Sequence, residues 1–202
     1  MTYRKLSDFI YDCDTCPTRC DGKSKGSYVF ENDLAFAEAQ ENIIIAKLRK
    51  LGRDAAKCTQ DGYPDIVIRE DDHIRSFVEV KAQRRTFMSV QRLLPQADLT
   101  PSETVALNLS DLQRYFGLYF EKRIPIFIIW VLQNRPCIVP AGESLYFYQT
   151  IPELHKIHEK YGNKRTFRRK SGRGDVVDGV HKGVVVNYHF SLKELKPLRF
   201  PH

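Results

Sequence analysis

The chain has 202 residues, of which 42% are hydrophobic and 28% are charged. This composition is ordinary for a soluble domain that buries a core. The longest apolar run, residues 124–132, is too short to span a bilayer. The first ten residues lack the apolar stretch of a secretion signal. We therefore expect an intracellular, cytoplasmic protein with no membrane segment.

The positive charge lies at one end of the chain. The net charge is +7, and residues 153–202 contain twelve Lys and Arg against five Asp and Glu. The first 152 residues are therefore neutral overall. A basic C-terminal quarter on a neutral body is typical of a protein that binds a polyanion, here nucleic acid. The alternative is a solvated tail that contributes only solubility.

The N-terminal third predicts an irregular segment followed by a helix. Residues 1–32 have no clear periodicity. A helix then begins at a cap on Asn32 or Asp33 and ends at Gly52. Apolar residues three and four positions apart predict a stripe that faces the core, and Glu41 lies on that stripe. The apolar members of the stripe are Leu34, Ala37, Ile44, Leu48 and Leu51.

A hairpin and further elements follow the helix. Residues 65–69 and 75–81 predict two strands joined by a turn at "EDDH". Beyond an irregular stretch at 84–109, the pattern predicts a helix at 110–123 and a strand at 124–132 that is buried on both faces. A strand at 135–141, a helix at 151–162 and a strand at 183–190 complete the expectation. The order predicts one α/β domain over 1–202, with a mixed central sheet flanked by helices.

The hairpin gathers charged side chains on one face. Alternation along the second strand places Phe77, Glu79 and Lys81 together, and the turn brings Asp65 beside Glu79. Two adjacent carboxylates repel unless a cation lies between them, and oxygen ligands suit Mg²⁺, with Mn²⁺ as a substitute. Glu41 could complete this site. The alternative is a solvated Glu/Lys pair, but Phe77 argues against it because a covered face makes uncompensated charges costly.

These residues resemble the pattern of the PD-(D/E)xK nuclease superfamily. The resemblance consists of a helix carrying Glu41, the Pro64–Asp65 pair, and the triplet Glu79-Val80-Lys81 followed by Gln83. It covers residues 33–132 and identifies no individual member. The N-terminal segment 1–32 and the basic C-terminal extension 133–202 lie outside the shared core.

The resemblance implies a restriction-endonuclease-like core and metal-dependent hydrolysis of phosphodiester bonds. It implies that Asp65 and Glu79 are metal ligands, with Glu41 as a further ligand, and that Lys81 is the catalytic cation. Gln83 matches branches of the superfamily that have a glutamine two positions after the lysine. The other Glu-x-Lys of the chain, Glu194 to Lys196, is interpreted as a chance occurrence.

A second metal site is a weaker hypothesis. The segment "CDTCPTRC" has one CxxC and a third thiol four residues on, which is half of a zinc motif. A histidine or Cys58 could supply a fourth ligand for structural Zn²⁺. The alternative is three ordinary thiols in an irregular segment. The cysteines concerned are Cys13, Cys16, Cys20 and Cys58.

Basic residues predict where DNA would lie. Six cations fall within residues 164–173, around Phe167, and such a loop would contact phosphates without reading bases. Two arginines just past the hairpin form a second set. The predicted DNA-binding residues are Arg84, Arg85, Lys164, Arg165, Arg168, Arg169, Lys170 and Arg173.

The expected function is therefore a Mg²⁺-dependent DNA endonuclease of restriction type or from a mobile element. A junction resolvase or repair nickase of the same fold is the nearest variant. A non-catalytic DNA-binding protein and a protein-interaction module are the alternatives from other classes. Duplex cleavage needs two active sites, so a homodimer is expected. The sequence contains no GxSxG, GxxxxGK or HExxH motif, which leaves serine hydrolases, P-loop enzymes and zinc proteases without support.

Overall fold

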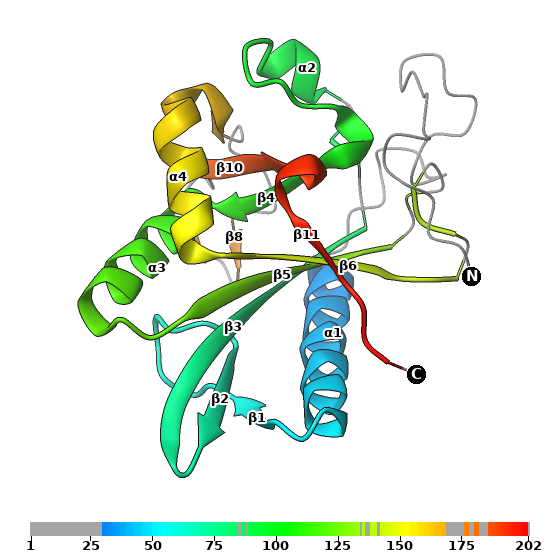
Figure 1. Ribbon diagram of the computed structural model, residues 1–202. Coiled ribbons are helices and arrows are strands. Elements are labelled where there is room, and N and C mark those ends of the chain that lie inside the picture. The colour runs from blue at the N-terminus through cyan, green and yellow to red at the C-terminus, as the bar shows by residue number, and fades with distance from the viewer. Residues whose placement is uncertain are drawn as a thin grey trace.

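A mixed six-stranded sheet, here called the main sheet, forms the centre of the computed structural model (Figure 1). Strand β3 runs parallel to β5, and the other neighbouring pairs are antiparallel. The fold class expected from the sequence is thereby confirmed. In spatial order the strands are β1 (Asp54–Lys57), β2 (Ile66–Glu70), β3 (His73–Gln83), β5 (Ile126–Leu132), β6 (Leu145–Thr150) and β11 (Lys196–Leu198).

The structure describes residues 30–84, 86–87, 89–133, 135, 138–140, 142–168, 176–177, 180–181 and 186–201. Its α-helices are α1 (Phe30–Lys50), α2 (Val90–Leu93), α3 (Leu109–Lys122) and α4 (Ile151–Tyr161). Short 3₁₀ turns lie at Pro101–Glu103, Gly162–Arg165 and Leu192–Glu194. Within the described ranges, no helix combines the length and the apolar character needed to cross a membrane.

A second, three-stranded sheet was not expected from the sequence. It consists of β4 (Thr104–Asn108), β10 (Val186–Ser191) and β7 (Thr166–Arg168), with β10 in the middle. A separate short ladder pairs β8 (Val176–Val177) with β9 (Val180–His181). The prediction that 84–109 is irregular is wrong for β4, where every residue up to Leu107 is buried. Strand β4 lacks the polar alternation of an exposed strand because it is covered on both faces.

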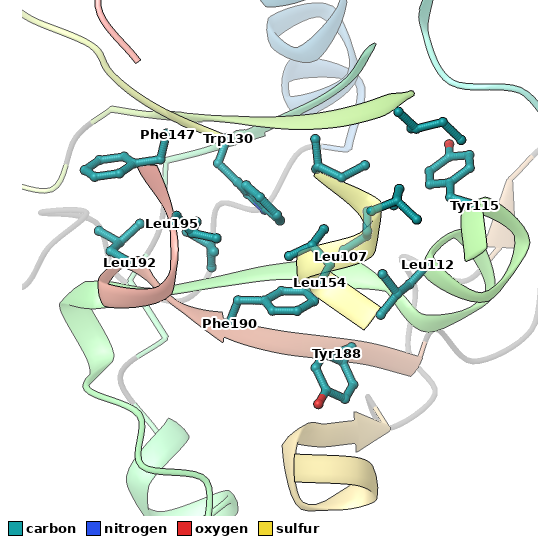
Figure 2. Packing of buried hydrophobic residues seen from close by; sticks show 14 of the residues in the cluster. Leu107, Leu112, Tyr115, Trp130, Phe147, Leu154, Tyr188, Phe190, Leu192 and Leu195 are labelled. Carbon is teal, nitrogen blue, oxygen red and sulfur yellow. The ribbon is translucent and has the colours of Figure 1, made fainter. Parts of the chain in front are cut away.

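The main sheet separates two hydrophobic layers. Ile128, Trp130 and Leu132 of β5 face the layer formed with α3, α4 and the second sheet (Figure 2). Ile129 and Val131 face the opposite layer, which contains Ile44 and Ile45 of α1. The continuous apolar run of β5 is therefore buried on both faces, as its sequence predicted.

Helix α1 covers the second layer with only its middle turns. It begins at Phe30, before the predicted cap, and ends where Gly52 adopts a φ of +73° and the Arg53 N–H donates to the Leu48 carbonyl at 3.1 Å. Leu34 and Leu51 are 59% and 45% exposed, so the predicted core stripe is wrong at both ends.

The C-terminal part of the chain contributes strands to both sheets. The predicted strand at 135–141 is wrong, because residues 138–140 form a turn and a bend. The next strand of the main sheet is instead β6. Pro140 interrupts the earlier segment, whereas the aromatic-rich sequence of β6 pairs with β5 along its whole length.

A bulge sets the register of the β2–β3 hairpin. Its two-residue turn, Asp71 and Asp72, has φ values of +49° and +62°, as a tight hairpin turn of this handedness requires. The register then shifts at Arg75, so that Ile66 lies opposite Val78. By the same register Asp65 lies opposite Glu79. Without the shift, Asp65 would lie opposite Val78, one residue short of the carboxylate.

Candidate active site

Glu79 is the most deeply buried carboxylate of the hairpin. It lies inside β3 on the face covered by α3, and it is 2% exposed. Its Oε2 accepts a hydrogen bond from the Tyr115 hydroxyl at 2.6 Å, and its Oε1 forms an ion pair with Lys81. A charge removed from water requires such partners. Both carboxylate oxygens are therefore held by side chains of the chain itself.

Lys81 lies between two carboxylates. Besides its ion pair with Glu79, its Nζ lies 3.6 Å from Oδ2 of Asp111 in the first turn of α3. Burial disfavours the charged form, but the charge and hydrogen bond of Glu79, with the charge of Asp111, raise the pKa of Lys81 above its ordinary value. Lys81 is thus a cation at neutral pH.

Asp65 stands beside Glu79 at the start of β2. Its Oδ2 accepts a hydrogen bond from the backbone N–H of Val80 at 2.8 Å. Burial, and next the charge of Glu79, raise the pKa of Asp65 to about 7. The structure therefore brings Asp65, Glu79 and Lys81 together.

Helix α3 supplies residues that the sequence analysis did not assign to the site. Asp111 and Tyr115 lie one turn apart and contact Lys81 and Glu79 respectively. Arg114 donates to Asp111 Oδ1 at 2.7 Å. Burial, and next the charge of Glu79, raise the pKa of Tyr115 far above its ordinary value, so its hydroxyl remains a donor. The signal in the sequence was Asp111 four residues before Tyr115 on one helix face, but an aromatic residue in an amphipathic helix is also explained by packing in the core.

Glu41 lies near the site but is not paired with its lysine. Its Oε2 lies 3.3 Å from Nζ of Lys57, which also bonds Glu38 at 3.1 Å. The charge of Glu41 contributes to the raised pKa of Asp65, after larger contributions from burial and Glu79. The side chain of Glu38 is 61% exposed, against 16% for Glu41. Of these two glutamates, Glu41 is therefore the one whose side chain is better placed to approach Asp65.

Gln83 is committed to the second sheet. Its Nε2 donates to the Ala106 carbonyl at 2.8 Å, and its Oε1 accepts from the Ala106 N–H at 3.3 Å. The amide thus imitates a neighbouring strand and joins β3 to β4. The structure gives Gln83 this structural contact and does not bring it into the Glu79–Lys81 pair.

The predicted DNA-binding residues separate into exposed and buried groups. Lys164 and Arg168 are exposed, and Arg84 stacks on Phe36, its guanidinium carbon 4.5 Å from the ring centroid. Arg165 is 1% exposed, which contradicts its assignment to the basic surface. The remaining predictions fall outside the described residues: Arg85, Arg169, Lys170 and Arg173.

Arg165 is a structural residue. Its guanidinium donates to Glu194 Oε2 at 2.6 Å and to the Ala97 carbonyl at 3.0 Å, and it stacks on the Tyr161 ring. Glu194 Oε2 also accepts the Ser191 N–H, as part of a capping box. The second Glu-x-Lys of the sequence is therefore part of a helix cap and an ion pair.

The zinc hypothesis rests on residues that are mostly outside the described ranges, which begin at residue 30 and so exclude Cys13, Cys16 and Cys20. Cys58 is a free, half-buried thiol packed against the core. Within the described part of the chain, no three His, Cys, Asp or Glu side chains are close enough to hold a metal ion by themselves.

No protein-family model matches this sequence, and no curated protein matches it either. Two solved structures that it resembles are Hjc, a Holliday junction resolvase from the archaeal hyperthermophile Archaeoglobus fulgidus, and D212, a nuclease from a fusselovirus. Hjc is 9% identical at a TM-score of 0.42, over 79% of this chain and 86% of Hjc. D212 is 12% identical at a TM-score of 0.44, over 87% of this chain and 91% of D212.

We expect Arg165→Ala to lower the free energy of unfolding by about 3–5 kcal/mol, because it leaves Glu194 without its buried partner. Chemical denaturation monitored by circular dichroism measures this loss. Lys164→Ala, at the exposed neighbouring position, is the control and should stay within about 0.5 kcal/mol of wild type. Equal stability of the two variants would contradict the structural role of Arg165.

Proposed function

We propose that this protein is a metal-dependent nuclease that hydrolyses phosphodiester bonds of DNA. The observation that carries the proposal is the ion pair between the buried Glu79 and the partly buried Lys81, with the partly buried Asp65 alongside. Burying these charges costs free energy that an apolar strand would not incur. Perturbed and buried ionisable groups are concentrated at functional sites. The pattern is that of the PD-(D/E)xK resemblance found in the sequence.

A divalent cation fits the residues that are present. Mg²⁺ is usually held by one or two carboxylates, with waters and substrate phosphate oxygens as its other ligands. Asp65 and Glu79 supply two such carboxylates, and their hydrogen bonds among the described residues leave Oδ1 of Asp65 for a ligand. Burial, and next the negative charge of Glu79, raise the pKa of Asp65, and a cation would offset the charge of Glu79. Glu41 is the weaker candidate ligand, because among the described residues it does not form a group of three ligands with Asp65 and Glu79.

The residues of the chain would then have separate roles. Asp65 and Glu79 would hold the cation, which when bound polarises the phosphate and activates water. Lys81 would stabilise the negative charge that develops on the phosphate during attack. Buried surroundings strengthen these electrostatic interactions.

DNA is the proposed substrate because of the exposed cations. Lys164 and Arg168 are exposed, and the basic sequence that they begin continues in residues 169–173. Such residues would hold the phosphate backbone without reading bases. We propose a homodimer for duplex cleavage, and a restriction-type or mobile-element enzyme, with a junction resolvase or repair nickase as the nearest variant.

We expect Asp65→Asn, Glu79→Gln and Lys81→Ala each to reduce cleavage of supercoiled plasmid in Mg²⁺ by about 100-fold or more. Each substitution removes one charge from the proposed centre. Gel quantification of nicked and linear product measures the rate, and circular dichroism checks that each variant is folded. Full activity in any folded variant would remove that residue from the mechanism.

A matched control exists on the same hairpin. Glu70→Gln removes an exposed carboxylate that pairs with Arg75 at 3.2 Å and lies far along the strands from Glu79. It should leave cleavage unchanged. A wild type that binds DNA but never cleaves it, in Mg²⁺ or Mn²⁺, would instead favour a non-catalytic DNA-binding protein.

We expect Glu41→Gln to have a weaker effect that depends on metal concentration. The Mg²⁺ concentration at half-maximal cleavage should rise about 10-fold, while the rate at saturating Mg²⁺ recovers most of its wild-type value. A Mg²⁺ titration of cleavage measures both quantities. Glu38→Gln, which also loses a partner of Lys57, is the control. If Glu38→Gln shows the larger shift, the ligand is Glu38.

We expect neutralisation of four cations in the segment 164–170, here called the basic cluster, to weaken DNA binding by a similar factor on every sequence. The plot of log affinity against log salt should also become flatter, by about 0.9 for each lost phosphate contact. Salt titrations of binding to unrelated duplexes measure this slope. The variant replaces Lys164, Arg168, Arg169 and Lys170 with Gln and keeps the buried Arg165.

The control variant removes the same charge from exposed positions elsewhere in the chain. If both variants flatten the slope equally, only net charge matters and the cluster is not a DNA surface. A loss confined to one sequence would mean that the cluster reads bases. The control replaces Lys50, Arg53, Arg75 and Arg92 with Gln.

A further inference from the structure

Helix α3 holds both charged ends of the Glu79–Lys81 pair. Tyr115 contacts the carboxylate and Asp111 contacts the ammonium, and the two residues are four positions apart on one helix face. The hairpin supplies the pair, and a separate element supplies the groups that hold it. This arrangement restricts two flexible side chains, because each has a partner on a rigid helix.

Tyr115 is placed to orient Glu79. The residue is 2% exposed, and its ring packs in the layer between the main sheet and the second sheet. In Figure 2 its hydroxyl points from α3 toward the main sheet, where the structure records the 2.6 Å hydrogen bond to Glu79 Oε2. Because this oxygen is held, the direction of the other oxygen is determined by the carboxylate plane.

Tyr188 provides a natural comparison in the same layer. It is 0% exposed, but no described group hydrogen-bonds to its hydroxyl, which in Figure 2 points away from the main sheet. Tyr115 and Tyr188 are therefore buried to a similar depth, but only the hydroxyl of Tyr115 donates a hydrogen bond to a described group.

Asp111 is placed to hold Lys81 when Glu79 is otherwise engaged. Its Oδ1 accepts from Arg114 at 2.7 Å, and its Oδ2 lies 3.6 Å from Nζ of Lys81, slightly too far for a tight pair. Glu153 has the same local arrangement in the first turn of α4, where it pairs with Lys156 three residues later. Glu153 makes no contact with the hairpin among the described interactions.

We propose that Tyr115 and Asp111 are positioning residues of the active site, Tyr115 for the carboxylate of Glu79 and Asp111 for the ammonium of Lys81. This inference rests on the proposed nuclease function. In it, Tyr115 keeps Glu79 in the orientation in which it receives a divalent cation. Asp111 keeps Lys81 at the centre once that cation competes for Glu79. Groups that orient a metal ligand typically change metal affinity or activity 10–100-fold when removed.

The first experiment measures Mn²⁺ binding by calorimetry, without DNA, in wild type, Tyr115→Phe and Tyr188→Phe. Each substitution removes one buried hydroxyl and keeps the ring. We expect Tyr115→Phe to weaken the Kd for Mn²⁺ by about 10–100-fold and Tyr188→Phe to leave it unchanged. Thermal unfolding in EDTA reports stability separately. If Tyr115→Phe changes only the Tm, its hydroxyl is structural and the proposal is wrong.

The second experiment compares Asp111→Asn with Glu153→Gln in plasmid cleavage at saturating Mn²⁺. Both variants remove an acidic residue from the first turn of a helix, where it pairs with a cation three residues later. The loss of helix stability should therefore be similar in the two variants. We expect Asp111→Asn to lower kcat about 10-fold or more at unchanged KM for DNA, and Glu153→Gln to match wild type. An Asp111→Asn variant that matches Glu153→Gln, or that raises only KM, would overturn the role of Asp111.

The outcomes separate this inference from the function on which it rests. A wild type that binds Mn²⁺ but does not cleave overturns the nuclease function, while the comparison of Mn²⁺ affinities still decides the role of Tyr115. A wild type that neither binds Mn²⁺ nor cleaves overturns both. A wild type that cleaves, with Tyr115→Phe and Asp111→Asn each equal to its control, overturns the inference alone.

Discussion

Glu79 and Lys81 form an ion pair on strand β3, in which Glu79 is buried between Phe77, Val78 and Val80 and Lys81 is partly exposed. A carboxylate that is 2% exposed requires donors within reach, and this requirement governs what surrounds it. Tyr115 approaches from α3, and the neighbouring strand contributes Asp65, which takes the Val80 N–H. The hairpin register therefore places Asp65 beside Glu79, and α3 supplies the hydroxyl whose hydrogen bond Glu79 accepts.

The second sheet closes that layer by means of side chains from the main sheet. Gln83 pairs both of its amide groups with the backbone of Ala106, and the Trp130 indole donates to the same carbonyl at 3.1 Å. Arg135, which is fully buried, donates to the carbonyls of Ser102 and Thr104 at 3.0 and 2.9 Å. Buried polar groups that are satisfied in this way give a core one arrangement rather than many. The strand above the site is therefore held by hydrogen bonds as well as by packing.

Local sequence patterns were sufficient to predict those elements whose periodicity, composition or turn residues are distinctive by themselves. The amphipathic α3, the doubly buried β5 and the two-residue turn of the hairpin each follow from period, composition or turn chemistry. Strand β4 was missed because a buried strand without alternation has no distinctive period. Arg165 was misassigned because a cation in a basic run looks alike in sequence whether it faces water or, as here, Glu194.

Sequence patterns alone predicted the chemistry of the hairpin. Glu79 and Lys81 lie two positions apart on one face of a strand, and Asp65 lies at the start of the partner strand. The packing of the strands determined how this juxtaposition is achieved, because the bulge at Arg75 moves the β2–β3 register by one residue and so places Asp65 opposite Glu79. Only the tertiary structure decided that Tyr115 and an acid one turn earlier hold the charged pair. Periodicity assigns a residue to a face of its own element, whereas contacts between elements depend on how the elements pack, which no local pattern encodes.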